Sequence, residues 1–144
     1  MKKSIFLRLT FMLILAFSVQ MAYSQTYVYK CVAITKNGDP WWHYTMNDDY
    51  YCIQFNENSC TAWWWDKSKK EWTNQKVYKI KHQAGPDGMR VYTRRRPGGV
   101  IVYGREKWCE DILEFEAGLN TFTSSTVYDG GNEEELIFTY QRTE

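Results

Sequence analysis

Histidine is scarce in this sequence, and the motifs of catalytic and metal sites are missing. The 144 residues include 2 histidines, His43 and His82, without the Cys-x-x-Cys or His-x-x-His spacing of a zinc site. A Gly-x-Ser-x-Gly nucleophile motif and a Gly-rich phosphate loop are also absent. Asp48 and Asp49 lack the remainder of a calcium-binding loop, so we interpret them as loop acids. We therefore expect no metal, no cofactor and no enzymatic activity.

Long apolar runs are confined to the first two dozen residues. This segment has the parts of a secretory signal: Lys2, Lys3 and Arg8, an apolar stretch over 9–19, and the small-x-small sequence Ala22-Tyr23-Ser24. The stretch is short for a membrane span, which disfavours the alternative of an uncleaved anchor. The first cysteine, Cys31, does not lie at the cleavage point, which argues against a lipoprotein. We expect a cleaved signal peptide over 1–24 and one soluble, extracytoplasmic domain over 25–144, periplasmic or secreted and without a membrane span.

A large charge of either sign is lacking as well. The whole chain has 18 Lys and Arg against 17 Asp and Glu, a net charge of +1. Removal of the leader takes away Lys2, Lys3 and Arg8, so 15 cationic residues remain against 17 acidic ones, a net charge of −2. Proteins that bind nucleic acids carry a strong positive excess that engages the phosphates. The charge therefore argues against nucleic acid as a partner.

Apolar and polar residues alternate with a period of two along the chain beyond the leader, which is typical of half-buried strands. The alternating segments are 27–34, 50–55, 61–65, 77–81, 89–93, 100–103, 113–117, 122–128 and 136–140. Turn-forming residues separate them, among them Pro97-Gly98-Gly99. The segment 105–118 also fits a helix, but the strict alternation within 113–117 favours a strand there.

About eight to ten short strands joined by short turns predict an all-β fold, a single antiparallel meander. Closure into a barrel or half-barrel removes exposed strand edges, and a two-sheet β-sandwich is the alternative. The closing segment Ile137–Arg142 resembles the last strand of small lipid-binding barrels, so the expected architecture is lipocalin-like. The Gly-x-Trp motif of lipocalins is absent, because Gly38 is followed by Asp39, Pro40 and Trp41. The resemblance therefore concerns architecture alone.

The cysteines are candidates for disulfides. Four of them lie beyond the leader, and an oxidising compartment would allow three complete pairings. A turn predicted at 56–59 closes a hairpin that brings Cys52 close to Cys60. Cys31 and Cys109 then remain for a second, long-range disulfide. A zinc site is the alternative, and the spacing disfavours it.

Aromatic residues are abundant, at 17% of the chain, which is well above the usual share. They are densest in the pair Trp41-Trp42 and in the run Trp63-Trp64-Trp65. In a strand, Trp63 and Trp65 face one side and Trp64 the other, so both faces of one sheet layer are aromatic. Packing in the core is one explanation, and a binding face is the other. We take Trp41, Trp42, Trp63 and Trp65 as candidate ligand-binding residues.

A basic run, Arg94-Arg95-Arg96, precedes the predicted turn at 97–99. A solvated strand end is the simpler interpretation of this run. The alternative is a clamp for an anion or carboxylate, in which Tyr92 and Arg94 project from the same strand face. We include Tyr92 and Arg94 among the candidate ligand-binding residues on that basis.

Two functions remain open at this point. In the first, a monomeric β-barrel binds a small apolar or carbohydrate ligand through its aromatic residues. In the second, the domain is an interaction module that attaches to an envelope or host protein through an exposed aromatic patch or an edge strand. A cavity that opens at a barrel end favours the first function, and a flat aromatic patch with an unpaired edge favours the second.

Overall fold

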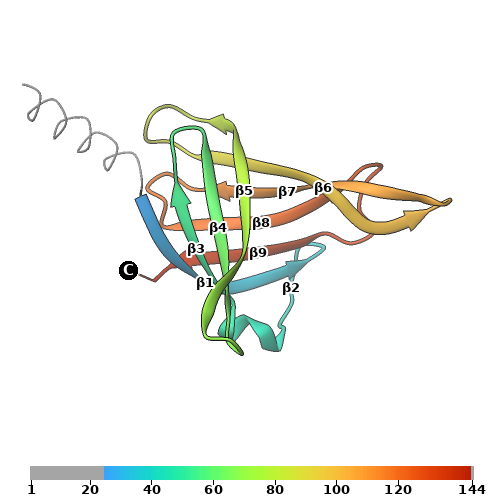
Figure 1. Cartoon of the computed structure of the whole chain (residues 1–144), viewed down its shortest axis with the longest axis horizontal. Helices are drawn as coiled ribbons and strands as arrows, with labels where there is room; N and C mark the ends of the chain where they lie inside the picture. Colours follow the sequence, from blue (N-terminus) through green and yellow to red (C-terminus); the bar gives the residue numbers. More distant parts are fainter. Residues whose placement is uncertain (1–24, 144) are drawn as a thin grey trace, which may run out of the picture.

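The alternating segments follow one another in one antiparallel sheet that closes on itself (Figure 1). The computed structural model describes residues 25–143, which form β1 (Gln25–Lys36), β2 (Asp39–Pro40), β3 (Tyr50–Phe55), β4 (Ser59–Asp66), β5 (Glu71–Gln83), β6 (Arg90–Val102), β7 (Arg105–Phe115), β8 (Thr121–Tyr128), β9 (Leu136–Arg142) and the 3-10 helix η1 (Tyr44–Asp48). β1 pairs with both β3 and β9, so eight strands form a closed barrel, and β2 adds to the end of β1. The predicted signal peptide, 1–24, lies outside the described residues.

The all-β barrel predicted from the alternation is confirmed, and the alternative of a two-sheet sandwich is wrong. Consecutive strands pair as neighbours, and the pairing of β1 with β9 closes the single sheet. The segment 105–118, for which a helix was the other possibility, contains strand β7. Among residues 25–143, no helix is long and apolar enough to cross a membrane.

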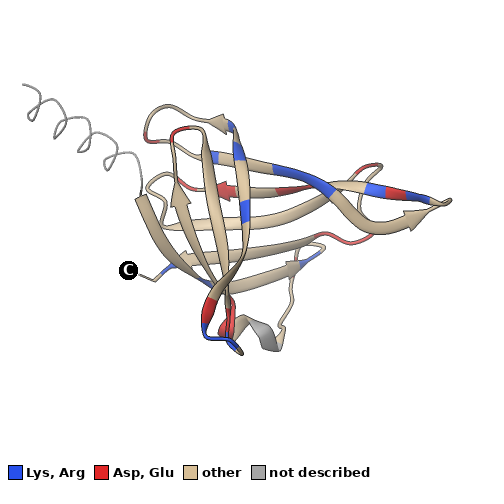
Figure 2. Cartoon of the chain, in the orientation of Figure 1, with Lys and Arg blue, Asp and Glu red and all other residues tan. Residues whose placement is uncertain are grey.

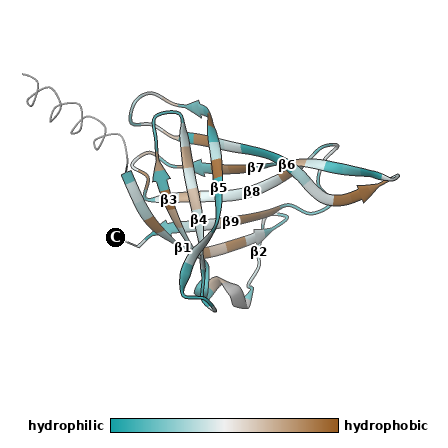
Figure 3. Cartoon of the chain, viewed as in Figure 1, coloured by the Kyte–Doolittle hydropathy of each residue, from teal (hydrophilic) through white to brown (hydrophobic). Residues whose placement is uncertain are grey.

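The prediction of a turn at Pro97-Gly98-Gly99 is wrong. These residues form an irregularity within β6, where the register against β7 shifts between Pro97 and Val100. A Cβ atom on Gly98 would come within 2.6 Å of the Tyr128 ring, so glycine lets the ring pack against the bent strand. The true turn follows at Tyr103 and Gly104, and the two strands project from the barrel as an arm with an apolar tip (Figures 1 and 3).

One end of the barrel, which we call the closed end, is filled by aromatic rings. Phe115 and Tyr29 are fully buried. The Phe115 ring lies 4.9 Å from Phe55 and 4.7 Å from Phe122, measured between ring centroids. The Tyr29 hydroxyl donates a hydrogen bond to the carbonyl of Leu119, at 2.7 Å, in the turn between β7 and β8. Rings of this size fill a narrow barrel with few residues.

The barrel opens towards its other end, because two of its strands diverge. In the part of the chain that the structure describes, β5 pairs with β6 only over Lys79–Gln83 and Arg90–Thr93. The remainder of β5 continues along β4, and the remainder of β6 continues along β7 into the arm (Figure 1). The lumen is therefore accessible at the end where η1 and the turn between β4 and β5 lie.

The structure does not contain the predicted disulfides, and all four cysteines are free thiols. In the hairpin of β3 and β4, Phe55 lies opposite Cys60, and Cys52 lies opposite Trp63. Cys52 and Cys60 are thus three residue positions apart, about 10 Å along the strand at 3.3 Å per residue, and on opposite faces of the sheet. A disulfide requires Cα atoms within about 7 Å, so the register separates this pair.

The second predicted disulfide, between Cys31 and Cys109, is prevented by the strand order. Cys31 lies opposite Tyr140 of β9, and Cys109 lies opposite Tyr128 of β8. Tyr140 in turn lies opposite Phe122, six residues before Tyr128 in the same strand. The two cysteines are therefore separated by two strands and by about 20 Å along the strand direction.

Candidate functional site

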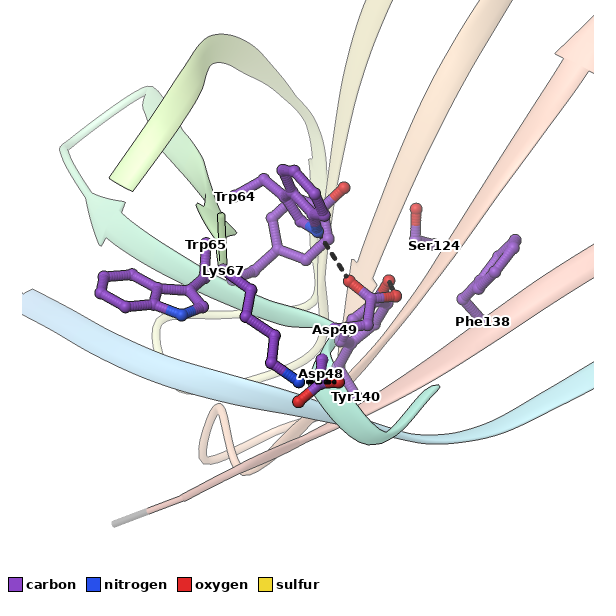
Figure 4. Close-up of a pocket in the computed structure, with 9 residues that line it drawn as sticks. Asp48, Asp49, Trp64, Trp65, Lys67, Ser124, Phe138 and Tyr140 are labelled. Atoms are coloured by element: carbon purple, nitrogen blue, oxygen red, sulfur yellow. Dashed lines mark hydrogen bonds and ion pairs between the residues drawn. The ribbon is translucent and has the colours of Figure 1, made fainter. Parts of the chain in front are cut away.

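A cavity of about 430 Å³ occupies the open end of the barrel (Figure 4). Its lining combines aromatic, acidic and small polar residues: Asp48, Asp49, Tyr51, Trp64, Trp65, Lys67, Ser124, Phe138 and Tyr140. These residues come from β3, β4, β8 and β9 and from the segments that precede β3 and follow β4. Strands that lie far apart in the chain therefore converge on one concave site, as is usual for small-molecule pockets.

Two tyrosines form the boundary between the closed end and the cavity. The Tyr140 ring stacks on Phe122 of the closed end, with centroids 4.7 Å apart and planes 7° apart. The Tyr51 ring packs edge-on against Tyr140 at 5.2 Å. Burial raises the pKa of Tyr51 to about 12 and raises the pKa of Tyr140 as well. Both hydroxyls therefore stay protonated at neutral pH, and that of Tyr140 donates a hydrogen bond in the lumen.

Asp49 supplies a carboxylate to the cavity, with Trp64 on one side and Ser124 and Phe138 on the other in the view of Figure 4. The Trp64 indole Nε1 donates a hydrogen bond to Asp49 Oδ1 at 3.1 Å, and the Tyr140 hydroxyl donates to Asp49 Oδ2 at 2.8 Å. Burial raises the pKa of Asp49 above its usual value, and these two neutral donors lower it only in part. The folded protein thus holds a partly dehydrated carboxylate at this site.

We expect the substitution Asp49→Asn to change how stability depends on pH. Because the folded-state pKa of Asp49 is raised above its reference value of 3.8, the folded state binds the proton more tightly than the unfolded state. The free energy of unfolding of the wild type therefore falls as pH rises from 3.8 through the raised pKa. Urea denaturation at a series of pH values should show the variant gaining stability relative to the wild type over that interval. A stability difference that does not change with pH would contradict the burial of the charge.

A second group of charges lies in the lumen near the base of the arm. Arg96 Nε and Nη2 bind the two oxygens of Asp111 at 2.6 and 3.0 Å, and Thr126 Oγ1 donates to Asp111 at 2.7 Å. Arg94 Nη1 lies 3.7 Å from the same carboxylate. Burial opposes ionisation of Asp111, but the hydrogen bonds from Arg96 and Thr126 outweigh it and lower its pKa. In this cluster two arginines share one carboxylate, and its hydrogen bonds fix β6, β7 and β8 to one another.

Trp63 and Trp64 lie on opposite faces of β4 as the alternation predicts, and Trp64 is on the inward face, but Trp65 also reaches the cavity. Trp64 lies opposite Tyr51 and lines the cavity, whereas Trp63 lies opposite Cys52 on the outer face. Trp65 contributes to the cavity rim and packs against Trp72, with ring centroids 5.1 Å apart. Of the candidates in this run, the structure therefore places Trp65 at the cavity and Trp63 away from it.

The other candidate residues do not line this cavity. Trp41 and Trp42 lie in the segment after β2, where Trp42 is 69% exposed. Tyr92 is buried in the closed end, 5.7 Å from Phe115 between ring centroids. Arg94 projects from the same face of β6 as Tyr92, as predicted, and faces Asp111. The structure thus separates these four residues into an exposed segment, the core and the charge cluster.

Sequence reasoning missed most of the cavity. Asp49 lies between η1 and β3, which fits its interpretation as a loop acid, but the sequence gives no sign that it is half-buried and hydrogen-bonded in the cavity. The face that Trp64 occupies is marked in the sequence by the small residues Cys60 and Ala62, both of which are buried. Recognising that face as the inner one would have favoured Trp64 over Trp63. The contributions of Ser124 and Phe138 depend on closure of the sheet and carry no local signal.

This site was also compared with metal-binding groups and with known proteins. Among residues 25–143, no three His, Cys, Asp or Glu side chains are grouped closely enough to hold a metal ion. Searches against family models, curated proteins and solved structures give no match to this chain. The site must therefore be interpreted from its own residues.

Proposed function

We propose that this chain is an exported small-molecule-binding barrel, whose ligand enters the open end and packs an apolar or ring-shaped body, such as that of a lipid fragment or a sugar, against the aromatic lining. The observation that carries the proposal is the cavity of about 430 Å³ within the lumen. Its volume lies within the range of roughly 300–1,000 Å³ that is usual for ligand pockets. Five aromatic side chains and a few polar groups line it, a composition that combines apolar contact with orientation by hydrogen bonds.

The rigid floor of the cavity supports this function. Tyr51 and Tyr140 are fixed by ring contacts to the closed end, and Trp64 is fixed by its hydrogen bond to Asp49. Side chains held in this way lose little conformational entropy when a ligand binds. A ligand therefore meets a preformed surface.

Filling the cavity should abolish binding. Ser124 lines the cavity, so Ser124→Phe places a ring in the space that the ligand would occupy. Thr123 is its neighbour in β8 and points to the outer face, so Thr123→Phe is the matched control. Each full chain is exported, purified gently and weighed by native and by denaturing mass spectrometry. We expect an extra mass that is lost on denaturation in the wild type and in the Thr123 variant, and no extra mass in the Ser124 variant. Equal adducts on both variants would place binding outside the cavity.

A protein partner is the second candidate function, and the exposed arm favours it. Tyr103 at the tip is 100% exposed and Ile101 is 73% exposed. A groove of about 500 Å³ lies beneath the arm, lined mostly by exposed residues that include Val100 and Val102. Exposed apolar groups of this kind mark interaction sites. A double substitution, Ile101→Ser with Tyr103→Ser, should abolish capture of an envelope protein under this function and leave the cavity adduct unchanged.

A further inference from the structure

The charges that line the cavity are not balanced. Lys67 Nζ lies 2.8 Å from Asp48 Oδ2, so these two residues neutralise one another at the rim. Asp49 receives hydrogen bonds from Trp64 and Tyr140, both neutral donors. Within the described part of the chain, no cationic side chain forms an ion pair with Asp49. The cavity therefore holds one carboxylate without a counter-ion.

The other cations of the lumen do not supply that counter-ion. Arg94 and Arg96 are directed at Asp111, and Lys76, opposite the buried Ala62, also acts on Asp111. The pKa of Asp49 is raised by its burial, and the two groups that oppose this rise are the neutral donors rather than a cation. A buried charge is costly unless a partner of opposite sign accompanies it. A ligand that carries a positive charge would remove this cost on binding.

The aromatic lining suits the same kind of ligand. Trp64, Phe138 and Tyr140 lie around the space beside the carboxylate (Figure 4), and Tyr51 also lines the cavity. The faces of such rings attract organic cations, and a site that combines several rings with one carboxylate is well suited to an alkylammonium group. A sugar would contact the rings equally well but would leave the charge of Asp49 uncompensated. Charge and lining together therefore favour a cation over a neutral ligand.

We infer that the ligand of this cavity is an organic ammonium ion, whose positive group sits against the Asp49 carboxylate and the rings of Trp64 and Tyr140. This inference rests on the proposed ligand-binding function and narrows its ligand class. The ammonium group forms an ion pair with Asp49, and its alkyl substituents contact the aromatic rings.

The test compares a cation with its neutral isostere. Choline and 3,3-dimethylbutan-1-ol have the same shape, and they differ in whether a positively charged nitrogen or a carbon stands at the branch point. Isothermal titration of the full exported chain, dialysed to remove any co-purified ligand, should show choline binding about tenfold or more tightly than the alcohol. Asp49→Asn should abolish this preference. Asp129→Asn, which changes an exposed acid that is paired with Arg95 and does not line the cavity, should retain it.

The possible results separate the inference from the function on which it rests. Equal binding of choline and the alcohol, or a preference that survives Asp49→Asn, would overturn the ammonium assignment and leave the cavity as a site for neutral ligands. Failure of both probes to bind, with a native adduct still present on the wild type and absent from the Ser124 variant, would also overturn the assignment alone. Failure of both probes together with the absence of any native adduct would overturn the ligand-binding function as well.

Discussion

Truncation of Phe115 to alanine is expected to cost about 4 kcal/mol of unfolding free energy, the usual size for a fully buried phenylalanine. Phe115 is fully buried, and its ring contacts Tyr29, Phe55, Tyr92 and Phe122. Removal of the ring leaves a cavity among other rings whose positions are fixed by strand pairing, so little collapse can follow. Urea denaturation followed by circular dichroism measures the loss.

Two further variants control this experiment. Val127 is 45% exposed on the outer face of β8, and Val127→Ala should change stability by less than about 0.5 kcal/mol. Phe115→Leu retains most of the buried volume and should remain folded if the alanine variant does not. A cost below about 1 kcal/mol for Phe115→Ala would show that the closed end is not the core of the barrel.

Substitution of Asp111 by asparagine has the second large expected effect. The side chain of Asp111 is 9% exposed and binds Arg96 through both oxygens, so its loss leaves arginine charges in the lumen without a partner. We expect a loss of about 3 kcal/mol, the low end for a broken buried pair, because the Arg96 side chain is 32% exposed. Urea denaturation at neutral pH measures this loss.

Two further measurements test this role of Asp111: the pH dependence of the stability loss, and the effect of a matched substitution in an exposed ion pair. Because the pKa of Asp111 is lowered, its contribution is fully present above 3.8 and is lost as pH falls through the folded-state pKa. The difference between the wild type and Asp111→Asn should therefore shrink in acid. Asp129 pairs with Arg95 at the exposed surface, and Asp129→Asn should leave stability unchanged within error. Equal effects of the two substitutions would contradict the structural role of the lumen cluster.

The fold could be predicted because the sequence patterns that specify its strands and turns each lie within a few consecutive residues. A period of two over most segments specifies strands, and short turns between them specify antiparallel neighbours. The segment 113–117 illustrates this, since strict alternation there identified a strand where a helix was the other possibility. Closure of the sheet followed from the general cost of exposed edges.

The site could not be predicted because it depends on register, which a single sequence does not specify. In the hairpin of β3 and β4, Cys60 lies opposite Phe55 and Cys52 lies opposite Trp63, so the two cysteines are at different levels of the barrel. Register also decides that Trp64, rather than Trp63, faces the lumen. Asp49 gains its role from Tyr140, 91 residues away in the chain, through closure of β9 onto β1.

The structure divides the barrel into two parts with different duties. The packed rings of the closed end stabilise the fold. The open end holds the Asp49 carboxylate partly dehydrated, which costs folding stability. In Figure 2, basic residues mark β6 as it enters the arm, and residues of both signs lie in the turn after β4. Substitutions in the two parts should therefore affect stability and binding separately.

The most direct measurement is a nuclear magnetic resonance titration of the indole N–H signals of the 7 tryptophans. The titrant is choline or the small molecules released from the gently purified protein by denaturation. Binding in the open end predicts shifts of the Trp64 and Trp65 indole signals, with those of the exposed Trp42 and Trp108 unchanged. Shifts confined to Trp42 and Trp108 would place the ligand on the outer surface and contradict a binding site within the barrel.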